Sequence, residues 1–303
     1  MPVATRLRPQ AGPRIAARTP EGWEDSPYER CTVEPLSPTI GAVIGGVSLA
    51  APVDAALRDE LNRALLEWKV LFFRGQDITR EQHAAFASLW GPLERHPFVK
   101  LHVAQPDDAP AVLRLEKNAT VPGVENVWHS DVTWREQPSL GSVLRAVEVP
   151  PLGGDTLWAD MGAAYDLLSA RLRAEIDELV AVHDWVDTFG RGMDDATREA
   201  LRPDFPPMQH PVVRTHPETG RRTLYVNGAF TQSVVGLEPE ASDALLARLY
   251  AQDSYPEVQC RFRWQPGDVA FWDNRSTQHY ATSDYYPQRR VKERITIVGD
   301  RPR

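Results

Sequence analysis

Short apolar segments separated by turn residues run along most of the chain, and they limit the folds open to it. Segments of this length and pattern are typical of β-strands. We expect strands at 111–116, 142–149, 210–215, 223–227, 259–264, 268–272 and 294–298. Helical spacing of apolar residues is rarer and occurs at 54–68, 79–91, 162–181 and 238–252. Many short strands with few helices predict a mainly β fold with flanking helices, a β-sandwich or jelly roll.

The 303 residues could form one large domain or two ordinary ones. Because no repeat or linker divides the sequence, we expect a single domain over residues 31–303. Residues 1–30 contain several Arg, Pro and Gly residues but no apolar run, which predicts a disordered tail and not a secretory signal. The stretch 190–209 is polar and long for a loop, as expected of a lid over a site.

Composition excludes several classes of protein. The net charge of −8, with acids and bases interspersed, argues against nucleic acid or a membrane surface as the main partner. The two cysteines, Cys31 and Cys260, form no CxxC motif, so we expect no disulfide framework. We therefore expect the protein to be located in a reducing cytoplasm. The remaining classes are enzymes that act on small molecules and small-molecule binding proteins. The chain could also form a homo-oligomer.

A histidine and an acid two residues apart provide the sharpest local pattern, His129-Ser130-Asp131. In an extended segment, residues i and i+2 point to one side, so both side chains could reach one ion. Two histidines and one carboxylate form the facial triad of non-haem Fe(II) oxygenases. Composition alone produces such a pair roughly once in a chain like this one. The second instance, at His216, lies in a predicted hairpin turn (217–220) where we expect Pro217 to direct it outward.

The third ligand must come from elsewhere, and His279 is the candidate because it follows a predicted strand. Arg290 and Arg294 come shortly after it and share a strand face if the last strand extends back to residue 290. Two guanidinium groups directed into one interior require anions, since a buried, unpaired arginine is costly.

Four ordered motifs resemble those of a known family. They are Trp-His-Ser-Asp-Val-Thr-Trp at 128–134, Gly-Gly-Asp-Thr at 153–156, Trp-Asp-Asn-Arg-Ser-Thr-Gln-His-Tyr at 272–280, and Pro-Gln-Arg-Arg with a later Arg and Gly-Asp at 287–300. Over about residues 33–300 the chain resembles the TauD/TfdA group of Fe(II)- and 2-oxoglutarate-dependent dioxygenases, the taurine dioxygenases most of all. The resemblance implies a double-stranded β-helix, which is a jelly roll with helices on one side.

The resemblance also implies roles for particular residues. It makes His129, Asp131 and His279 the Fe(II) ligands and the catalytic centre. It assigns the distal carboxylate of 2-oxoglutarate, the co-substrate, to Arg290 and Thr156, and a guanidinium suits a carboxylate because it can donate two parallel hydrogen bonds. With O₂, such enzymes couple decarboxylation of 2-oxoglutarate to succinate and CO₂ with hydroxylation of a substrate carbon.

The substrate pocket follows the same resemblance. The expected partners of a sulfonate are His96 and Arg294, and the expected pocket lining is Val132, Phe189 and Phe230. Two positions depart from the taurine enzymes: Glu125 stands in place of an Asn near the substrate amine, and Val99 in place of a Tyr. Glu125 could pair with an ammonium group, reshape the pocket for another compound, or point to solvent.

We therefore expect a small anionic substrate, taurine or a related sulfonate, with release of sulfite and an aldehyde. Alternatives are an alkyl-sulfate dioxygenase that releases sulfate, and an aryloxyalkanoate dioxygenase. A non-catalytic jelly-roll module that binds a metal or an anion would not need the 2-oxoglutarate pocket. A hydrolytic zinc enzyme would need a general base, and no HExxH motif supplies one.

Overall fold

The structure is a computed structural model and describes residues 12–95, 98 and 111–303. Its largest sheet has eight strands in the order β1-β2-β3-β14-β6-β16-β4, and β5 also pairs with β16. The strands are β1 (Thr32–Pro35), β2 (Ala42–Gly45), β3 (Val70–Phe73), β4 (Leu93–Glu94), β5 (Leu113–Lys117), β6 (Ser139–Glu148), β14 (Val269–Asp273) and β16 (Arg290–Val298). Because β16 begins at Arg290, Arg290 and Arg294 lie on one strand, as the sequence predicts.

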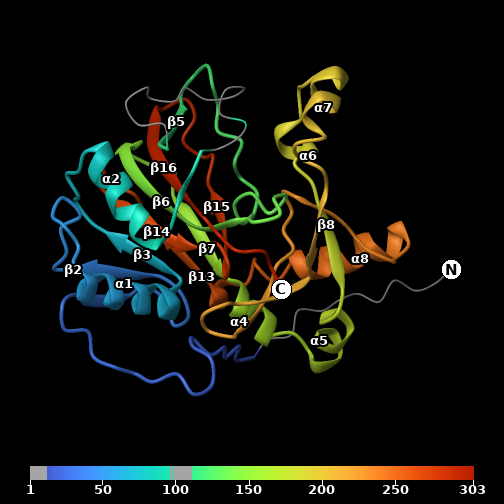
Figure 1. The fold of residues 1–303 in the computed structure, drawn as a ribbon, viewed down its shortest axis with the longest axis horizontal. Helices are drawn as coiled ribbons and strands as arrows, with labels where there is room; N and C mark the ends of the chain where they lie inside the picture. Colours follow the sequence, from blue (N-terminus) through green and yellow to red (C-terminus); the bar gives the residue numbers. More distant parts are fainter. Residues whose placement is uncertain (1–11, 96–97, 99–110) are drawn as a thin grey trace.

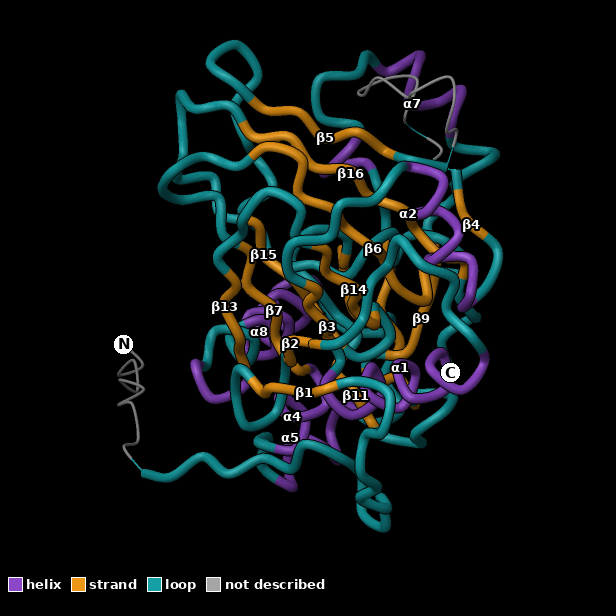
Figure 2. The backbone as a smooth tube through the Cα atoms, turned by 90° about the vertical axis from the view of Figure 1, so that its left-hand side faces the viewer, coloured by secondary structure: helices purple, strands orange, loops and turns teal. Residues whose placement is uncertain are grey.

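A second, smaller antiparallel sheet packs against the first. It consists of β13 (Gln259–Phe262), β7 (Thr156–Asp160) and β15 (Thr277–Ala281), which lie side by side in Figure 2. Aromatic side chains fill the space between the sheets: Phe72 stacks on Phe262 with ring centroids 4.0 Å apart. Trp158 meets Trp272 with centroids 5.8 Å apart. Two sheets around an apolar interior form the predicted jelly roll.

Two helices cover the outer face of the large sheet, α1 (Ala55–Trp68) and α2 (Arg80–Ala87), followed by the short η1 (Ser88–Trp90) (Figure 1). Leu61 and Leu65 of α1 join a buried cluster with Phe271 of β14. Thr79 begins α2 with the predicted capping box, since its hydroxyl accepts from the Gln82 backbone N–H and the Gln82 side chain accepts from the Thr79 N–H.

Further elements pack beside the small sheet (Figure 1). They are β8 (Val180–His183), β9 (Met208–Pro211), β10 (Val213–Thr215), β11 (Arg222–Leu224), β12 (Thr231–Val234), α4 (Met161–Asp166), α5 (Ala170–Ile176), α8 (Pro239–Tyr250) and η2 (Pro256–Val258). Antiparallel pairing of β10 with β11 confirms the predicted hairpin. The single helix predicted over 162–181 is wrong. The chain breaks after α4, the Ser169 hydroxyl caps a new helix by accepting from Leu172 N–H, and β8 begins at Val180.

The stretch 190–209, predicted as a loop, contains a helix. It follows α6 (Val186–Phe189) and includes α7 (Asp195–Leu201), which Asp194 caps by accepting from Thr197 N–H at 2.7 Å. Phe205 packs with Trp134 and Trp185 in an aromatic cluster. The end of the segment is therefore anchored by packing against buried apolar side chains. Its role as a lid stays a prediction.

The described part of the expected tail contacts the domain. Arg18 pairs with Glu67 at 2.9 Å, and the Tyr28 hydroxyl donates to Glu67 at 2.6 Å. The Arg221 guanidinium donates to the Arg18 carbonyl at 2.9 Å. The domain boundary near residue 30 stays a prediction. Within the described ranges, no helix has both the length and the apolar character to cross a membrane.

Candidate active site

The backbone pairs His129 with His279 in an isolated antiparallel bridge. His129 N–H donates to the His279 carbonyl at 3.0 Å, and His279 N–H donates to the His129 carbonyl at 2.8 Å. The imidazole centroids lie 4.1 Å apart. The bridge thereby brings the side chains of His129 and His279 together, although the two residues are distant in sequence. Asp131, two positions after His129, lies beside both of them.

The three side chains have the spacing of a metal centre. The Nε2 atoms of His129 and His279 each lie 4.0 Å from Asp131 Oδ1, and the three candidate ligand atoms lie within 4.8 Å of one another. Two metal–ligand bonds of about 2.1 Å can span such a distance. Among the described residues, this is the group of three metal-ligating side chains that could share an ion. Its donor set fits Fe(II).

Burial and neighbouring charges set the protonation states that a metal needs. Burial lowers the pKa of His129 and lowers that of His279 well below the usual value, so both rings are neutral at pH 7. His129 Nδ1 lies 2.9 Å from the Val127 carbonyl, which assigns the proton to Nδ1 and leaves Nε2 free to bind a metal. Burial alone would raise the pKa of Asp131, but the Arg294 guanidinium and the two histidines hold it well below its usual range.

Hydrogen bonds hold the Asp131 carboxylate in place. Its Oδ2 accepts from Ser142 Oγ at 2.8 Å and from Asn274 Nδ2 at 3.2 Å, while Oδ1 accepts from Arg294 Nη1 at 2.6 Å. Asn274 is in turn held by the Trp272 indole N–H, which donates to its Oδ1 at 2.9 Å. We did not predict these supporting residues from the sequence, although Trp272 and Asn274 belong to a motif that could have indicated them.

Arg290 and Thr156 line the neighbouring part of the interior. Arg290 is 8% exposed, its Nε has no hydrogen-bond partner among the described residues, and its Nη1 lies 3.4 Å from the Tyr285 hydroxyl. At Gly154 the backbone has a φ of +70°, and a Cβ there would lie 3.1 Å from Pro150 Cγ and 3.3 Å from Tyr285 Cδ1. The predicted Gly-Gly motif thus lets the loop before β7 pack closely on Tyr285, whose hydroxyl meets Arg290.

Three of the predicted pocket residues lie together beside the triad. Phe230 meets the His129 ring edge-on with centroids 6.2 Å apart, and Phe189 stacks on Phe230 at 5.9 Å. Val132 packs in the same buried cluster and has a φ of 50°, unusual for a β-branched residue and thus a strained position. The predicted substrate ligand His96 lies outside the described residues.

Glu125 has a counter-ion that the sequence did not reveal. Its Oε1 lies 2.6 Å from Lys117 Nζ, at the end of β5. Burial alone would raise the pKa of Glu125, but the Lys117 ammonium lowers it, so the carboxylate is ionised and already paired.

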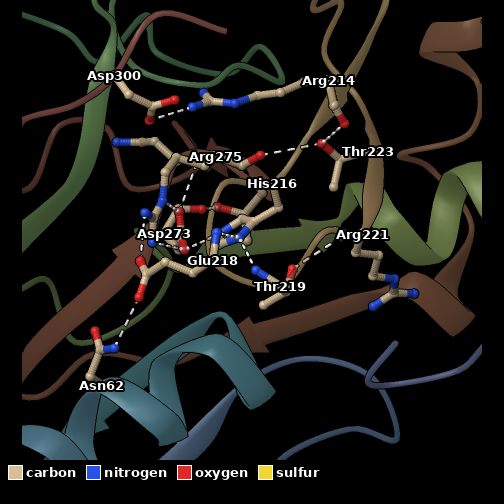
Figure 3. Close-up of polar contacts among 12 residues, drawn as sticks. Asn62, Arg214, His216, Glu218, Thr219, Arg221, Thr223, Asp273, Arg275 and Asp300 are labelled. Carbon is tan, nitrogen blue, oxygen red and sulfur yellow. Dashed lines mark hydrogen bonds and ion pairs between the residues drawn. The ribbon is translucent and has the colours of Figure 1, made fainter. Parts of the chain in front are cut away.

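The outward orientation predicted for His216 is wrong. The side chain is 2% exposed, and its Nε2 lies 2.9 Å from Asp273 Oδ2. Its Nδ1 accepts from the backbone N–H groups of Glu218 and Thr219, at 3.2 and 3.1 Å. The hairpin turn thus folds back over its own histidine and directs it to a buried carboxylate (Figure 3). Among the described residues, the group that could share a metal ion consists of His129, Asp131 and His279 and does not include His216.

A jelly roll that holds two histidines and one carboxylate beside buried arginines has the architecture of a non-haem Fe(II) dioxygenase. Comparison with known proteins agrees. Residues 32–296 match the family described as "Taurine catabolism dioxygenase TauD, TfdA family". The chain belongs to this family.

Similar proteins are alike over nearly their full length. An alkylsulfatase of Acinetobacter baylyi is 38% identical over 91% of this chain and 87% of its own. An alpha-ketoglutarate-dependent sulfate ester dioxygenase of Pseudomonas putida is 39% identical over 89% of this chain and 90% of its own. The crystal structure of a taurine dioxygenase from Burkholderia xenovorans matches this structure with a TM-score of 0.78 and 39% sequence identity. The match covers 90% of this chain and 93% of the other. The predicted fold, the enzyme class and the need for Fe(II), 2-oxoglutarate and O₂ are confirmed.

Proposed function

We propose that this dioxygenase hydroxylates an alkyl sulfonate or an alkyl sulfate ester. Fe(II) is held by His129, Asp131 and His279, and 2-oxoglutarate by Arg290 and Thr156. One oxygen atom of O₂ enters succinate and the other enters the substrate, at the carbon that bears sulfur or the ester oxygen. The hydroxylated carbon then expels sulfite or sulfate and becomes an aldehyde. Relatives named as an alkylsulfatase and a sulfate ester dioxygenase support this chemistry.

The observation that carries the proposal is the position of Arg294. Its Nη1 contacts the Asp131 oxygen that lies nearest the histidines, while its Nε is buried without a partner among the described residues. A guanidinium has five N–H donors and no acceptor, so most of its donors can meet the oxygens of a tetrahedral anion. The substrate anion would thus be bound directly beside the metal.

The other end of the pocket favours an alkyl chain over the amine of taurine. Phe189, Phe230 and Val132 offer apolar surface. Glu125, the residue expected to meet an ammonium group, is already paired with Lys117 at 2.6 Å. A substrate amine would have to displace Lys117, whereas an alkyl chain leaves the ion pair intact.

The chain prepares the site before its ligands arrive. Neutral histidines and an ionised Asp131 can take up Fe(II) without first losing protons. Asp131 would hold Fe(II) together with the two histidines, and the Arg294 guanidinium, whose Nη1 donates to Asp131 Oδ1 at 2.6 Å, would then be free to donate to the substrate anion. Bound Fe(II) supplies the activation of O₂, and a reducing cytoplasm, predicted from two free cysteines, would keep it ferrous.

We expect the enzyme to release succinate with a medium-chain alkyl sulfate or with pentanesulfonate. We expect far less succinate with taurine, because Glu125 is already paired with Lys117 and cannot bind the substrate amine. The measurement is a succinate-release panel of those three compounds and phenoxyacetate, with Fe(II), O₂ and 2-oxoglutarate present. Reactions without 2-oxoglutarate, and with Zn(II) in place of Fe(II), are the controls. Coupling to phenoxyacetate alone would overturn the sulfur-compound proposal.

Replacing Arg290 with Ala is expected to raise the KM for 2-oxoglutarate about ten- to a hundredfold, the usual effect of losing a hydrogen bond to a charged group. The KM for the prime substrate should change little. Arg289→Ala is the matched control, because Arg289 is exposed and pairs with Glu116 and Glu148 away from the pocket. If only the prime-substrate KM rose, the roles of Arg290 and Arg294 would have to be exchanged.

A further inference from the structure

A third basic side chain projects from β16 into the same interior, and the proposed site has no role for it. Lys292 lies between Arg290 and Arg294, and alternate residues of a strand share a face. Its register partners are Ala146 of β6 and Leu115 of β5, so it lies where β16 is paired on both sides. Only 1% of its surface is exposed.

Lys292 has no acidic partner in the described ranges of the chain. Its Nζ lies 3.4 Å from Thr156 Oγ1 and 3.6 Å from the centroid of the Trp264 ring. Among the residues that the structure describes, no carboxylate lies within the 4.0 Å of an ion pair. Burial and the neighbouring Arg290 hold the pKa of Lys292 well below its usual value, and the charges of Asp155, Asp268 and Glu125 act on it only from further away. An ammonium buried in this way is costly unless a ligand supplies the anion.

The hydroxyl of Thr156 indicates where that anion would bind. Its Oγ1 accepts from the Trp264 indole N–H at 3.0 Å and faces Lys292 Nζ at 3.4 Å. An indole N–H and an ammonium can only donate, so both lone pairs of the hydroxyl oxygen are occupied when Lys292 is protonated. The hydroxyl proton of Thr156 remains to be donated, as does the buried N–H at Arg290 Nε. Lys292, Thr156 and Arg290 therefore each have an N–H or O–H donor available for an anion, and a carboxylate offers about four acceptor sites.

We propose that Lys292 binds the distal carboxylate of 2-oxoglutarate together with Arg290 and Thr156. In this position it selects a 2-oxo acid with a second carboxylate over one with a single carboxylate. This inference rests on the proposed 2-oxoglutarate pocket. A bound carboxylate favours the ammonium form of Lys292, which then adds a second positive charge beside that of Arg290. The two side chains together carry one positive charge more than the carboxylate neutralises.

The test compares 2-oxoglutarate with 2-oxovalerate, which has the same chain length but no distal carboxylate. Their Kd values are measured by calorimetry on the anaerobic, Fe(II)-loaded enzyme, where no turnover occurs. In Lys292→Met, the preference for 2-oxoglutarate should fall about ten- to a hundredfold, while the Kd of 2-oxovalerate stays within about twofold. Arg289→Met removes an exposed positive charge from the adjoining segment and should leave the preference unchanged.

The possible results separate the two proposals. An unchanged preference in Lys292→Met would overturn the role of Lys292. A wild-type enzyme without any preference would contradict the 2-oxoglutarate pocket itself. Lys292→Met should melt at or above the wild-type Tm, because an apolar side chain replaces a buried amine that has no ion pair within the described part of the chain. A large loss of Tm in both Lys292→Met and Lys292→Gln would show that Lys292 serves the packing of Trp264, and would also overturn the proposal.

Discussion

Replacing Asp131 with Ala is expected to abolish Fe(II) binding and to lower turnover by more than about a hundredfold, since losing even a residue that only supports a ligand costs ten- to a hundredfold. The two histidines lie 4.0 Å from its Oδ1 and provide no negative charge of their own. Without the carboxylate, Arg294 also loses its ion pair with Asp131, and its charge would repel the metal. The measurements are iron content per chain after anaerobic loading, and succinate release.

Ser142→Ala is the matched control for this prediction. It removes the 2.8 Å hydrogen bond to Asp131 Oδ2 and a long one of 3.5 Å that Ser142 Oγ accepts from Asn274 Nδ2, and leaves the carboxylate in place. Iron affinity should therefore fall about tenfold and still allow full loading at high Fe(II). Folding is followed by circular dichroism in both variants. Stoichiometric iron in a folded Asp131→Ala protein would show that the ligand set is wrong.

The metal-ligating group could be predicted from the sequence because its geometry depends on local rules. His129 and Asp131 have the spacing at which side chains of an extended segment share one side, and His279 follows β14 and lies in β15. The sequence could not reveal the bridge that joins His129 to His279, because pairing between distant segments depends on the whole sheet. The common face of Arg290 and Arg294 followed from strand alternation. The same alternation indicates Lys292, which we overlooked.

Other predictions failed where tertiary partners decide the outcome. His216 was expected to point outward because Pro217 follows it, but a buried acceptor at Asp273 outweighs that local preference. The apolar spacing over 162–181 continued a helical pattern, yet α4 ends at Asp166 and the Ser169 hydroxyl caps the start of a separate helix. Glu125 looked available to a substrate amine, and only the fold brings Lys117 from β5 to its side.

Replacing Asp273 with Asn is expected to lower the free energy of unfolding by about 3–5 kcal/mol, as for other broken buried ion pairs. The carboxylate is 1% exposed. Its Oδ1 accepts from Arg275 Nε at 2.9 Å, and its Oδ2 accepts from Arg275 Nη2 at 2.8 Å and meets His216 Nε2 at 2.9 Å (Figure 3). Asn would leave the Arg275 charge buried with Glu218 as its remaining acidic partner. Urea denaturation at pH 7 measures the loss.

The pH dependence of this loss distinguishes an ion pair from simple packing. Burial alone would raise the pKa of Asp273, but Arg275 and His216 hold it well below its usual range. A lowered pKa in the folded state stabilises the fold above the unfolded value of about 4, and this contribution declines as the pH falls below that value. The difference between wild type and Asp273→Asn should therefore be largest near pH 7 and shrink below about pH 4.

Glu218→Gln supplies the control at the same arginine. Glu218 accepts from Arg275 Nη1 at 2.7 Å, but its side chain is 39% exposed, so its loss should cost at most about 1 kcal/mol. Because Asn274 follows Asp273 and holds Asp131, Asp273→Asn should also weaken Fe(II) binding, whereas Glu218→Gln should not. A stability difference for Asp273→Asn that stays constant from pH 7 to about pH 3 would contradict the ion-pair explanation. Equal losses of unfolding free energy in both variants would show that Arg275 is stabilised as much by its pair with Glu218 as by its pair with Asp273, and would contradict the larger role given to Asp273.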